Sequence, residues 1–262
     1  YAKRPGFDQI AQGMGGIMSV TGLPGQGPVR AGIPVADLTA GLYTAIGILV
    51  ALLEREATGK GRWVHTSLLE AMVAMMDFQA TRWTMKGDVP KQAGNDHPTT
   101  VPTGLFRTSD GIMNLAGGGQ EMWNRIVATL GIEEEAKAPE FATDKTRAQN
   151  RAATNALLQA KLETDTTANW VARLNKAGVP SGPVYSMDQV FADEQVKHLG
   201  LAWSVDHPTL GTIDLVRSPM QIEGAQPPRR PTPERGEHTE EVLKEFGLTA
   251  EEIAALRGKG AI

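Results

Sequence analysis

The carboxylate of Asp37 is the first candidate for chemistry in this sequence. It follows a short apolar run, Pro34-Val35-Ala36, and precedes apolar residues at three- and four-residue spacing that predict a helix over residues 38–53. An Asp between an apolar run and the start of a helix has two interpretations. It caps the start of the helix, or it is a nucleophile that the N–H groups and the dipole of the helix start keep ionised.

Two further groups of polar residues could bind a substrate. Asp8 and Gln12 lie four apart, on one face of a helix predicted over residues 7–20, where the alternative is a solvated helix start. Gly94, Asn95 and His97 lie in a polar loop. There a glycine lets the backbone approach a ligand, and the amide or imidazole can bind a carboxylate or an oxyanion. The alternative is a polar loop that only crosses between domains.

The evidence for a functional role is weaker for the remaining candidates. Lys3 and Arg4 could pair with phosphates of a ligand, although two basic residues in a loop are usually solvated. The histidines show no metal-ligand spacing, so we predict no metal site. Residues 117–120, three glycines and Gln120, follow a predicted strand and precede a predicted helix, so we interpret them as a connection.

The elements that would position these residues mix helices and short strands. Ser67 with Glu70 predicts the start of a second helix over residues 68–79, after a short strand over 62–66. Hairpins are predicted over residues 104–116 and 205–216, and Thr249 with Glu252 predicts the start of a last helix. A Pro-rich segment, residues 224–233, has no periodicity and is expected to be extended.

Composition excludes several classes of protein. The chain has 262 residues, 41% of them hydrophobic, which is enough for one or two domains. The net charge of −4 without a basic block argues against nucleic acid as a partner. The absence of cysteine excludes disulfides, thiolate metal sites and a cysteine nucleophile. Residues 42–53 are too short for a membrane span and no signal peptide is visible, so we predict a cytoplasmic protein without a membrane partner.

Motifs along the whole chain resemble those of the family III CoA-transferases, the formyl-CoA and carnitine/crotonobetainyl-CoA transferase type. The matching segments are 4–12 (RPGFDQIAQ), 18–22 (MSVTG), 34–41 (PVADLTAG), 58–61 (TGKG), 94–98 (GNDHP), 177–180 (AGVP) and 236–239 (GEHT). The resemblance implies that Asp37 is a covalent nucleophile, that Asp8 and Gln12 lie near it, and that the substrate is an acyl-CoA.

The resemblance also implies an architecture. It is an α/β fold with an incomplete Rossmann-like large domain and an inserted smaller α+β domain. Residues 1–92 would form the large-domain portion with the nucleophile, 93–207 the small domain, and 208–262 the return segment and closing helices. Because the family carries an N-terminal portion that supplies much of the CoA site, this chain is expected to be a fragment that binds CoA weakly or not at all by itself. Family members form interlocked dimers, and the same is expected here.

The implied reaction moves CoA from an acyl-CoA donor to a carboxylic acid through an aspartyl intermediate. One alternative is an acyl-CoA racemase of the same fold, but related racemases carry His where this chain has Phe7, so one base for proton transfer is missing. Another alternative is a truncated remnant without activity.

Overall fold

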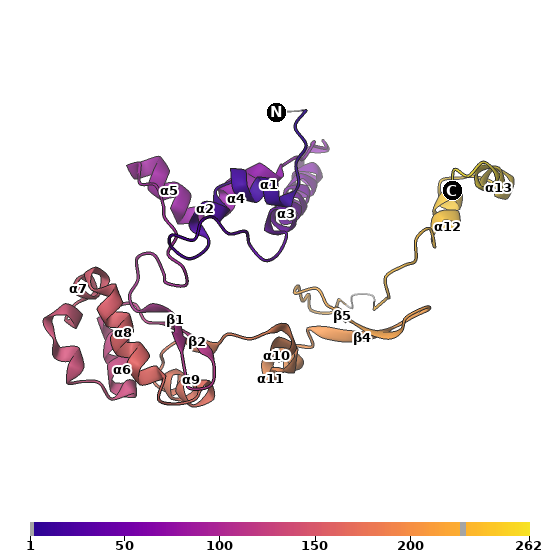
Figure 1. The fold of residues 1–262 in the computed structure, drawn as a ribbon. Helices are drawn as coiled ribbons and strands as arrows, with labels where there is room; N and C mark the ends of the chain where they lie inside the picture. The colour runs from indigo at the N-terminus through magenta and orange to yellow at the C-terminus, as the bar shows by residue number, and fades with distance from the viewer. Residues whose placement is uncertain (1–2, 226–228) are drawn as a thin grey trace. The chain divides into compact units, whose positions relative to one another are not determined.

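The computed structural model describes residues 3–225 and 229–262. The chain divides into two compact units, Tyr1–Val184 and Tyr185–Ile262, and each is described by itself. Figure 1 labels their helices and strands. The predicted domain boundaries after residues 92 and 207 stay a prediction, although residue 207 lies within a hairpin of the second unit.

The first unit begins with helices that carry the candidate nucleophile. They are α1 (Asp8–Met14), α2 (Ile17–Val20), α3 (Val35–Thr58), α4 (Leu68–Met75) and α5 (Asp77–Lys86), and α1 packs against both α3 and α4. A Cβ at Gly15 would lie 2.3 Å from the Cβ of Met72, so only glycine allows the end of α1 to approach α4 this closely.

Two of the predicted helices are interrupted. The helix predicted over residues 7–20 divides into α1 and α2, because Gly16 has a φ of 93°. The helix predicted over 68–79 ends at Met75, and Asp77, with a φ of 46°, redirects the chain into α5. Ser67 caps α4 as predicted, its Oγ accepting from the N–H of Glu70 at 3.2 Å.

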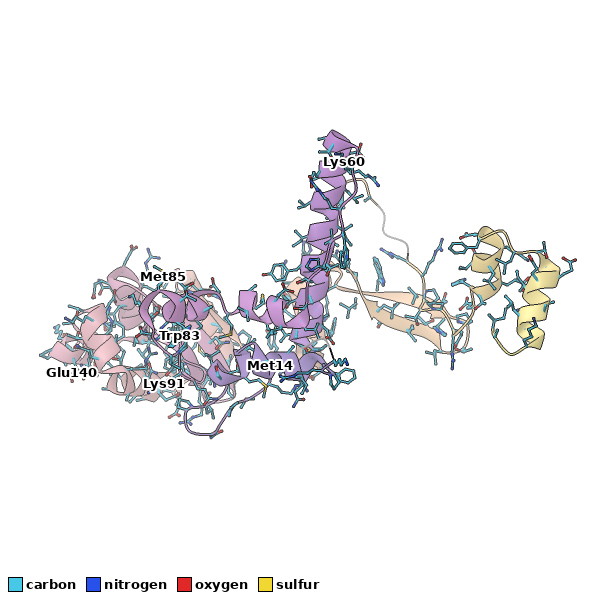
Figure 2. All side chains as sticks on the ribbon, turned by 90° about the horizontal axis from the view of Figure 1, so that it is seen from above. Met14, Lys60, Trp83, Met85, Lys91 and Glu140 are labelled. Carbon is cyan, nitrogen blue, oxygen red and sulfur yellow. The ribbon has the colours of Figure 1, made fainter. Side chains whose placement is uncertain are left out.

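Helix α3 begins earlier than the sequence pattern predicted. It includes Val35 and Ala36 of the apolar run that was expected to precede it, and it ends at Thr58, before Gly59, whose φ is 68°. Residues 62–66, predicted as a strand, pair with no strand in the part of the chain that the structure describes. Figure 2 shows that the half of α3 nearer Lys60 extends beyond α1 and α4.

An apolar stripe follows one side of α3. Its residues are spaced by three or four, and each is more than half exposed: Leu38, Leu42, Ile46, Leu49 and Leu53. By length and composition α3 also meets the criterion for a membrane span, with a mean hydropathy of 1.8, contrary to the sequence prediction, because the helix is 24 residues long. A single helix of this kind is weak evidence, since helices of soluble proteins meet the same criterion.

The rest of the first unit is a small sheet covered by helices. Strands β1 (Thr103–Arg107), β2 (Ile112–Ala116) and β3 (Ser181–Pro183) are antiparallel in that order, and the first hairpin is as predicted. The longer helices of this part are α6 (Gln120–Leu130), α7 (Asp144–Gln149), α8 (Arg151–Leu162) and α9 (Thr167–Lys176), and two short 3-10 turns, Glu135–Lys137 and Pro139–Phe141, lie between α6 and α7.

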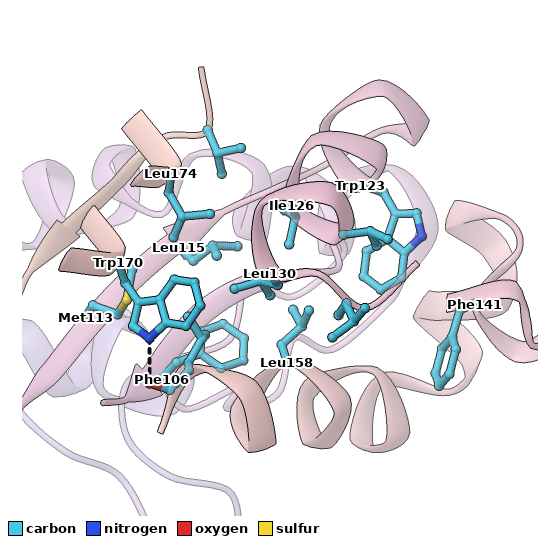
Figure 3. Packing of buried hydrophobic residues seen from close by; sticks show 14 residues of the cluster. Phe106, Met113, Leu115, Trp123, Ile126, Leu130, Phe141, Leu158, Trp170 and Leu174 are labelled. Carbon is cyan, nitrogen blue, oxygen red and sulfur yellow. Dashed lines mark hydrogen bonds between the residues drawn. The ribbon is translucent and has the colours of Figure 1, made fainter. Parts of the chain in front are cut away.

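The largest buried apolar cluster lies between this sheet and its helices. Figure 3 shows Phe106 and Met113 of the strands beside Ile126, Leu158 and Trp170 of the helices. The indole N–H of Trp170 donates to the carbonyl of Leu162 at 2.9 Å, so the one polar atom of this side chain is satisfied inside the cluster.

The second unit contains a hairpin and short helices. They are α10 (Met187–Ala192), α11 (Glu194–Leu199), β4 (Ala202–His207), β5 (Gly211–Val216), α12 (Thr239–Glu245) and α13 (Ala250–Gly258). The predicted hairpin and the capping box of Thr249 and Glu252 are confirmed. The mixture of helices and strands is therefore as predicted, and both described sheets are antiparallel.

Candidate functional site

Asp37 is the third residue of α3, and its side chain is exposed. The interpretation of Asp37 as the cap of this helix is wrong, because the residue in the capping position is Pro34, which offers no side-chain acceptor. No described residue hydrogen-bonds to the Asp37 carboxylate or forms an ion pair with it. The carboxylate is therefore accessible to a reactant from outside the described chain.

The acceptor at the start of α3 comes from another helix. Asp8, on α1, is 9% exposed, and its Oδ1 accepts from the backbone N–H of Ala36 at 2.8 Å and from that of Asp37 at 3.4 Å. A carboxylate is a favourable acceptor there because the first N–H groups of a helix have no partner inside the helix. Asp8 thus provides the side-chain acceptor that Pro34 lacks at the start of α3.

Gln12 fixes Asp8 and the loop before α3. Its fully buried amide donates to Oδ2 of Asp8 at 2.6 Å and to the carbonyl of Ile33 at 3.3 Å, and its Oε1 accepts from the N–H of Ala31 at 2.9 Å. Asp8 contacts the backbone of Asp37, as the resemblance implied, and Gln12 contacts Asp8. A solvated helix start is wrong because both are buried. Their observed partners belong to the protein, and their role in binding substrate stays a prediction.

The loop that begins at Gln92 is anchored to the loop after α2. The side-chain amide of Gln92 donates to the carbonyls of Thr21, at 2.7 Å, and Gly27, at 2.6 Å. Gly94, with a φ of 65°, donates its N–H to the carbonyl of Gly22 at 3.1 Å. Gly94 is therefore used for a tight approach between two loops of the chain itself.

His97 has a defined tautomer when it is neutral. Its Nδ1 accepts from the N–H groups of Thr99, at 3.3 Å, and Thr100, at 3.0 Å, so the proton of the neutral ring is on Nε2. The ring stacks with Phe78 at a centroid distance of 6.2 Å. The nitrogen left for a ligand is a hydrogen-bond donor, which suits a carboxylate or an oxyanion.

Asp96 and Asn95 are neighbours in this loop, but their side chains have different surroundings. The carboxylate of Asp96 accepts from the amide of Asn155 on α8 at 3.2 Å and lies 4.0 Å from the guanidinium of Arg151. Asn95 lines a cavity of about 310 Å³ together with residues of all three strands, including Asn114 and Ser181. No sequence pattern indicated that Asp96 anchors this loop, because its partners lie more than fifty residues away.

The structure does not join every candidate to one site. No hydrogen bond or ion pair links Asp37 to Gly94, Asn95 or His97 within the described residues. Lys3 and Arg4 are exposed ahead of α1, and their predicted contact with CoA phosphates stays a prediction. Among residues 3–225 and 229–262, no group of three His, Asp or Glu side chains could hold a metal ion.

Comparisons with known proteins agree with the motifs. Residues 1–239 match the family described as CoA-transferase family III. Succinyl-CoA:glutarate CoA-transferase of Mus musculus is 34% identical over 247 residues, which are 92% of this chain and 56% of the relative. Succinate–glutarate CoA-transferase of Agrobacterium fabrum is 33% identical, over 94% of this chain and 62% of the relative.

A solved structure supports the same assignment. The crystal structure of a CAIB/BAIF family protein from Brucella suis superposes with a TM-score of 0.80 at 36% identity, and the match covers 94% of this chain and 64% of that one. The chain spans about three-fifths of the length of the curated relatives it matches. On the family match over residues 1–239, the chain belongs to CoA-transferase family III.

Proposed function

We propose that the full-length protein transfers CoA from an acyl-CoA to a carboxylic acid, with Asp37 as the covalent nucleophile. Family membership supports the reaction class. The single observation that supports Asp37 is its exposed carboxylate on a helix start whose first N–H groups are already occupied by Asp8. A carboxylate that donates no hydrogen bond and receives none from the described chain keeps its electron pairs available for attack.

The steps balance without a metal or a redox partner. The Asp37 carboxylate attacks the thioester carbonyl, the C–S bond breaks, and a mixed anhydride and CoA thiolate form. The thiolate attacks the Asp37 carbonyl, which gives an enzyme-bound thioester and releases the donor acid as a carboxylate. The acceptor carboxylate then attacks this thioester, and the released thiolate attacks the acceptor carbonyl of the second anhydride, which regenerates Asp37.

The loop of Asn95 and His97 supplies donors suited to this chemistry. Each anhydride or thioester step places negative charge on a carbonyl oxygen, and fixed donors aimed at such an oxygen lower the barrier. We assign the Nε2–H of His97 and the amide of Asn95 to this role, with the acceptor carboxylate or the oxyanion as their partner. We assign Lys3 and Arg4 to the CoA phosphates.

The architecture and assembly that we propose follow the same family. Helices α1–α5 would belong to a Rossmann-like large domain, and the β1–β3 sheet with its helices to an inserted smaller domain. The protein would be a cytoplasmic, interlocked homodimer. The named relatives act between succinyl-CoA and glutarate, so small dicarboxylic acids are the first acceptors to test.

The test is a substrate screen on the full-length protein. Succinyl-CoA, acetyl-CoA and formyl-CoA are each mixed with a panel of mono- and dicarboxylic acids, and new CoA thioesters are measured by mass spectrometry. Transfer to at least one acid, with a mass adduct on the Asp37 peptide, is the expected result. Epimerisation of a 2-methylacyl-CoA without transfer would instead support a racemase. Complete inactivity of a folded protein would support a remnant.

A further inference from the structure

The start of α3 depends on a side chain that is distant in the sequence. The backbone N–H groups of Ala36 and Asp37 belong to the first turn of the helix, where they have no acceptor in the helix itself. Pro34, in the capping position, provides no side-chain acceptor. Oδ1 of Asp8 accepts from both N–H groups, at 2.8 Å and 3.4 Å, and holds the backbone of Asp37 directly.

Asp8 is itself held in place. Its second oxygen accepts from the amide of Gln12 at 2.6 Å, and that amide is fully buried and bonded to the loop at Ala31 and Ile33. The hydrogen bonds of Asp8 and Gln12 thus run from α1 to the loop and to the first turn of α3. Because Asp8 is buried and both of its carboxylate oxygens accept hydrogen bonds, its side chain is held in one orientation by its neighbours.

We propose that Asp8 is a positioning residue for the reaction, acting on Asp37 through the backbone and not on the substrate. This inference rests on the proposed role of Asp37 as nucleophile. Asp8 would do two things. It fixes the turn that aims the Asp37 carboxylate, and it occupies the N–H groups that would otherwise hydrogen-bond to that carboxylate and weaken it as a nucleophile.

The charge of Asp8 adds to this effect. The Asp8 carboxylate on α1 lies within hydrogen-bond distance of the Asp37 backbone, so it repels the Asp37 carboxylate, and this repulsion is relieved when Asp37 becomes a neutral anhydride. The negative charge of Asp8 therefore favours the step in which Asp37 loses its own charge. Loss of Asp8 removes both the fixed geometry and this repulsion, so the chemical step slows while substrate binding is retained.

The test compares Asp8→Ala, Asp8→Asn and Gln9→Ala in the full-length protein. Asn keeps an oxygen for the two N–H groups, loses the charge and also loses the acceptor for the Gln12 amide. Gln9 is an exposed neighbour on α1 and serves as the control. The readouts are kcat, KM for both substrates, and the single-turnover rate at which the Asp37 peptide gains the acyl or CoA mass. Circular dichroism checks that each variant is folded.

Asp8→Ala is expected to lower kcat and the adduct rate by about 10²-fold with KM nearly unchanged, the size of effect that a small misplacement of a reacting group produces. Asp8→Asn should recover part of this loss, and Gln9→Ala should behave as wild type. If Asp8→Ala does not fold, Asp8→Asn decides, since its adduct rate must fall below that of wild type.

Two results would overturn the inference while leaving the proposed function intact. One is an adduct rate in both Asp8 variants equal to that of the wild type. The other is a raised KM with unchanged kcat, which would make Asp8 a substrate-binding residue. Absence of any adduct on the wild-type Asp37 peptide would instead remove the nucleophile, and the inference with it.

Discussion

The carboxylate of Asp8 accepts the backbone N–H of Ala36 at 2.8 Å across 28 positions of the chain. The relationship joins two of the segments that match the family, residues 4–12 and 34–41, into one structural feature. The position of the first turn of α3, which contains Asp37, therefore depends on hydrogen bonds to a buried side chain on α1. The proposed chemistry of Asp37 would thus depend on a helix cap that comes from another helix.

Removal of the Asp37 carboxylate should abolish transfer without unfolding the protein. The side chain is exposed and makes no hydrogen bond in the described chain, so Asp37→Ala should leave the melting temperature near that of wild type. Turnover should fall by roughly 10³-fold or more, as for other covalent nucleophiles. The matched control is Glu56→Ala, an exposed acid on the same helix, which should keep full activity. Turnover retained by Asp37→Ala would disprove the assignment.

Asp96 should control the loop that carries Asn95 and His97. Asp96→Ala removes the hydrogen bond to Asn155 and the ion pair with Arg151, so the loop is less well held against α8. We expect KM for the acceptor acid to rise several-fold with little change in melting temperature, measured by steady-state kinetics and thermal unfolding. Asn155→Ala should have the same effect, whereas the exposed Asp88→Ala should have none. An unchanged KM in both loop variants would contradict a substrate-binding role for the loop.

Asp110 should make the stability of the β1–β3 sheet and its helices decrease at acidic pH. The backbone N–H of Thr167 at the start of α9 is the main cause that lowers the pKa of this carboxyl, and the hydroxyls of Thr167 and Thr108 add to it. A lowered pKa in the folded state means that the ionised group stabilises the fold above its unfolded-state pKa. This stabilisation is lost as the pH falls through the folded-state value.

The measurement is the melting temperature of Asp110→Asn against wild type from neutral to acidic pH. The variant should melt a few degrees lower at neutral pH, and the difference should shrink as the pH is lowered. Glu133→Gln, an exposed acid on the same unit, is the control and should show no such convergence. A difference that stays constant with pH would show that the charge of Asp110 does not matter.

The proposed interlocked dimer predicts slow exchange of subunits. Residues 224–233 were expected to be extended and to lie over a partner, because Pro227, Pro228, Pro231 and Pro233 cannot donate ladder hydrogen bonds. Pro227 and Pro228 lie outside the described residues, and Pro231 and Pro233 lie in neither a helix nor a strand. Sedimentation of the full-length protein should show a dimer at all practical concentrations. Mixing of labelled and unlabelled protein should produce mixed dimers only after partial unfolding, so a monomer or rapid mixing would refute the arrangement.

Local signals in the sequence predicted the local structure well. Ser67 and Thr249 cap helices as predicted, and both hairpins form where short apolar runs flank turn residues. These features depend on residues a few positions apart, so one stretch of sequence contains all the information. The local pattern around Asp37 was compatible with a helix cap and with a nucleophile. The resemblance to the family favoured the nucleophile.

The features that the sequence did not predict depend on distant partners. The run Pro34-Val35-Ala36 was expected to be extended, but Val35 and Ala36 are helical because Asp8 supplies the missing acceptor from α1. The break at Asp77 requires a positive φ that no local residue pattern indicated. Likewise, Asp96 acquires its function only from partners on α8, which a single sequence does not place beside it.

The apolar stripe on α3 has a consequence for how the stability of this 262-residue chain is measured. Side chains that face water gain free energy when a second molecule, a detergent micelle or a reporter dye such as anilinonaphthalene sulfonate covers them. Any such ligand that binds the folded state raises the midpoint of unfolding by mass action. Association of two copies through the stripe would therefore make the melting temperature rise with protein concentration, so each measured value should be given with the concentration of protein, detergent and dye.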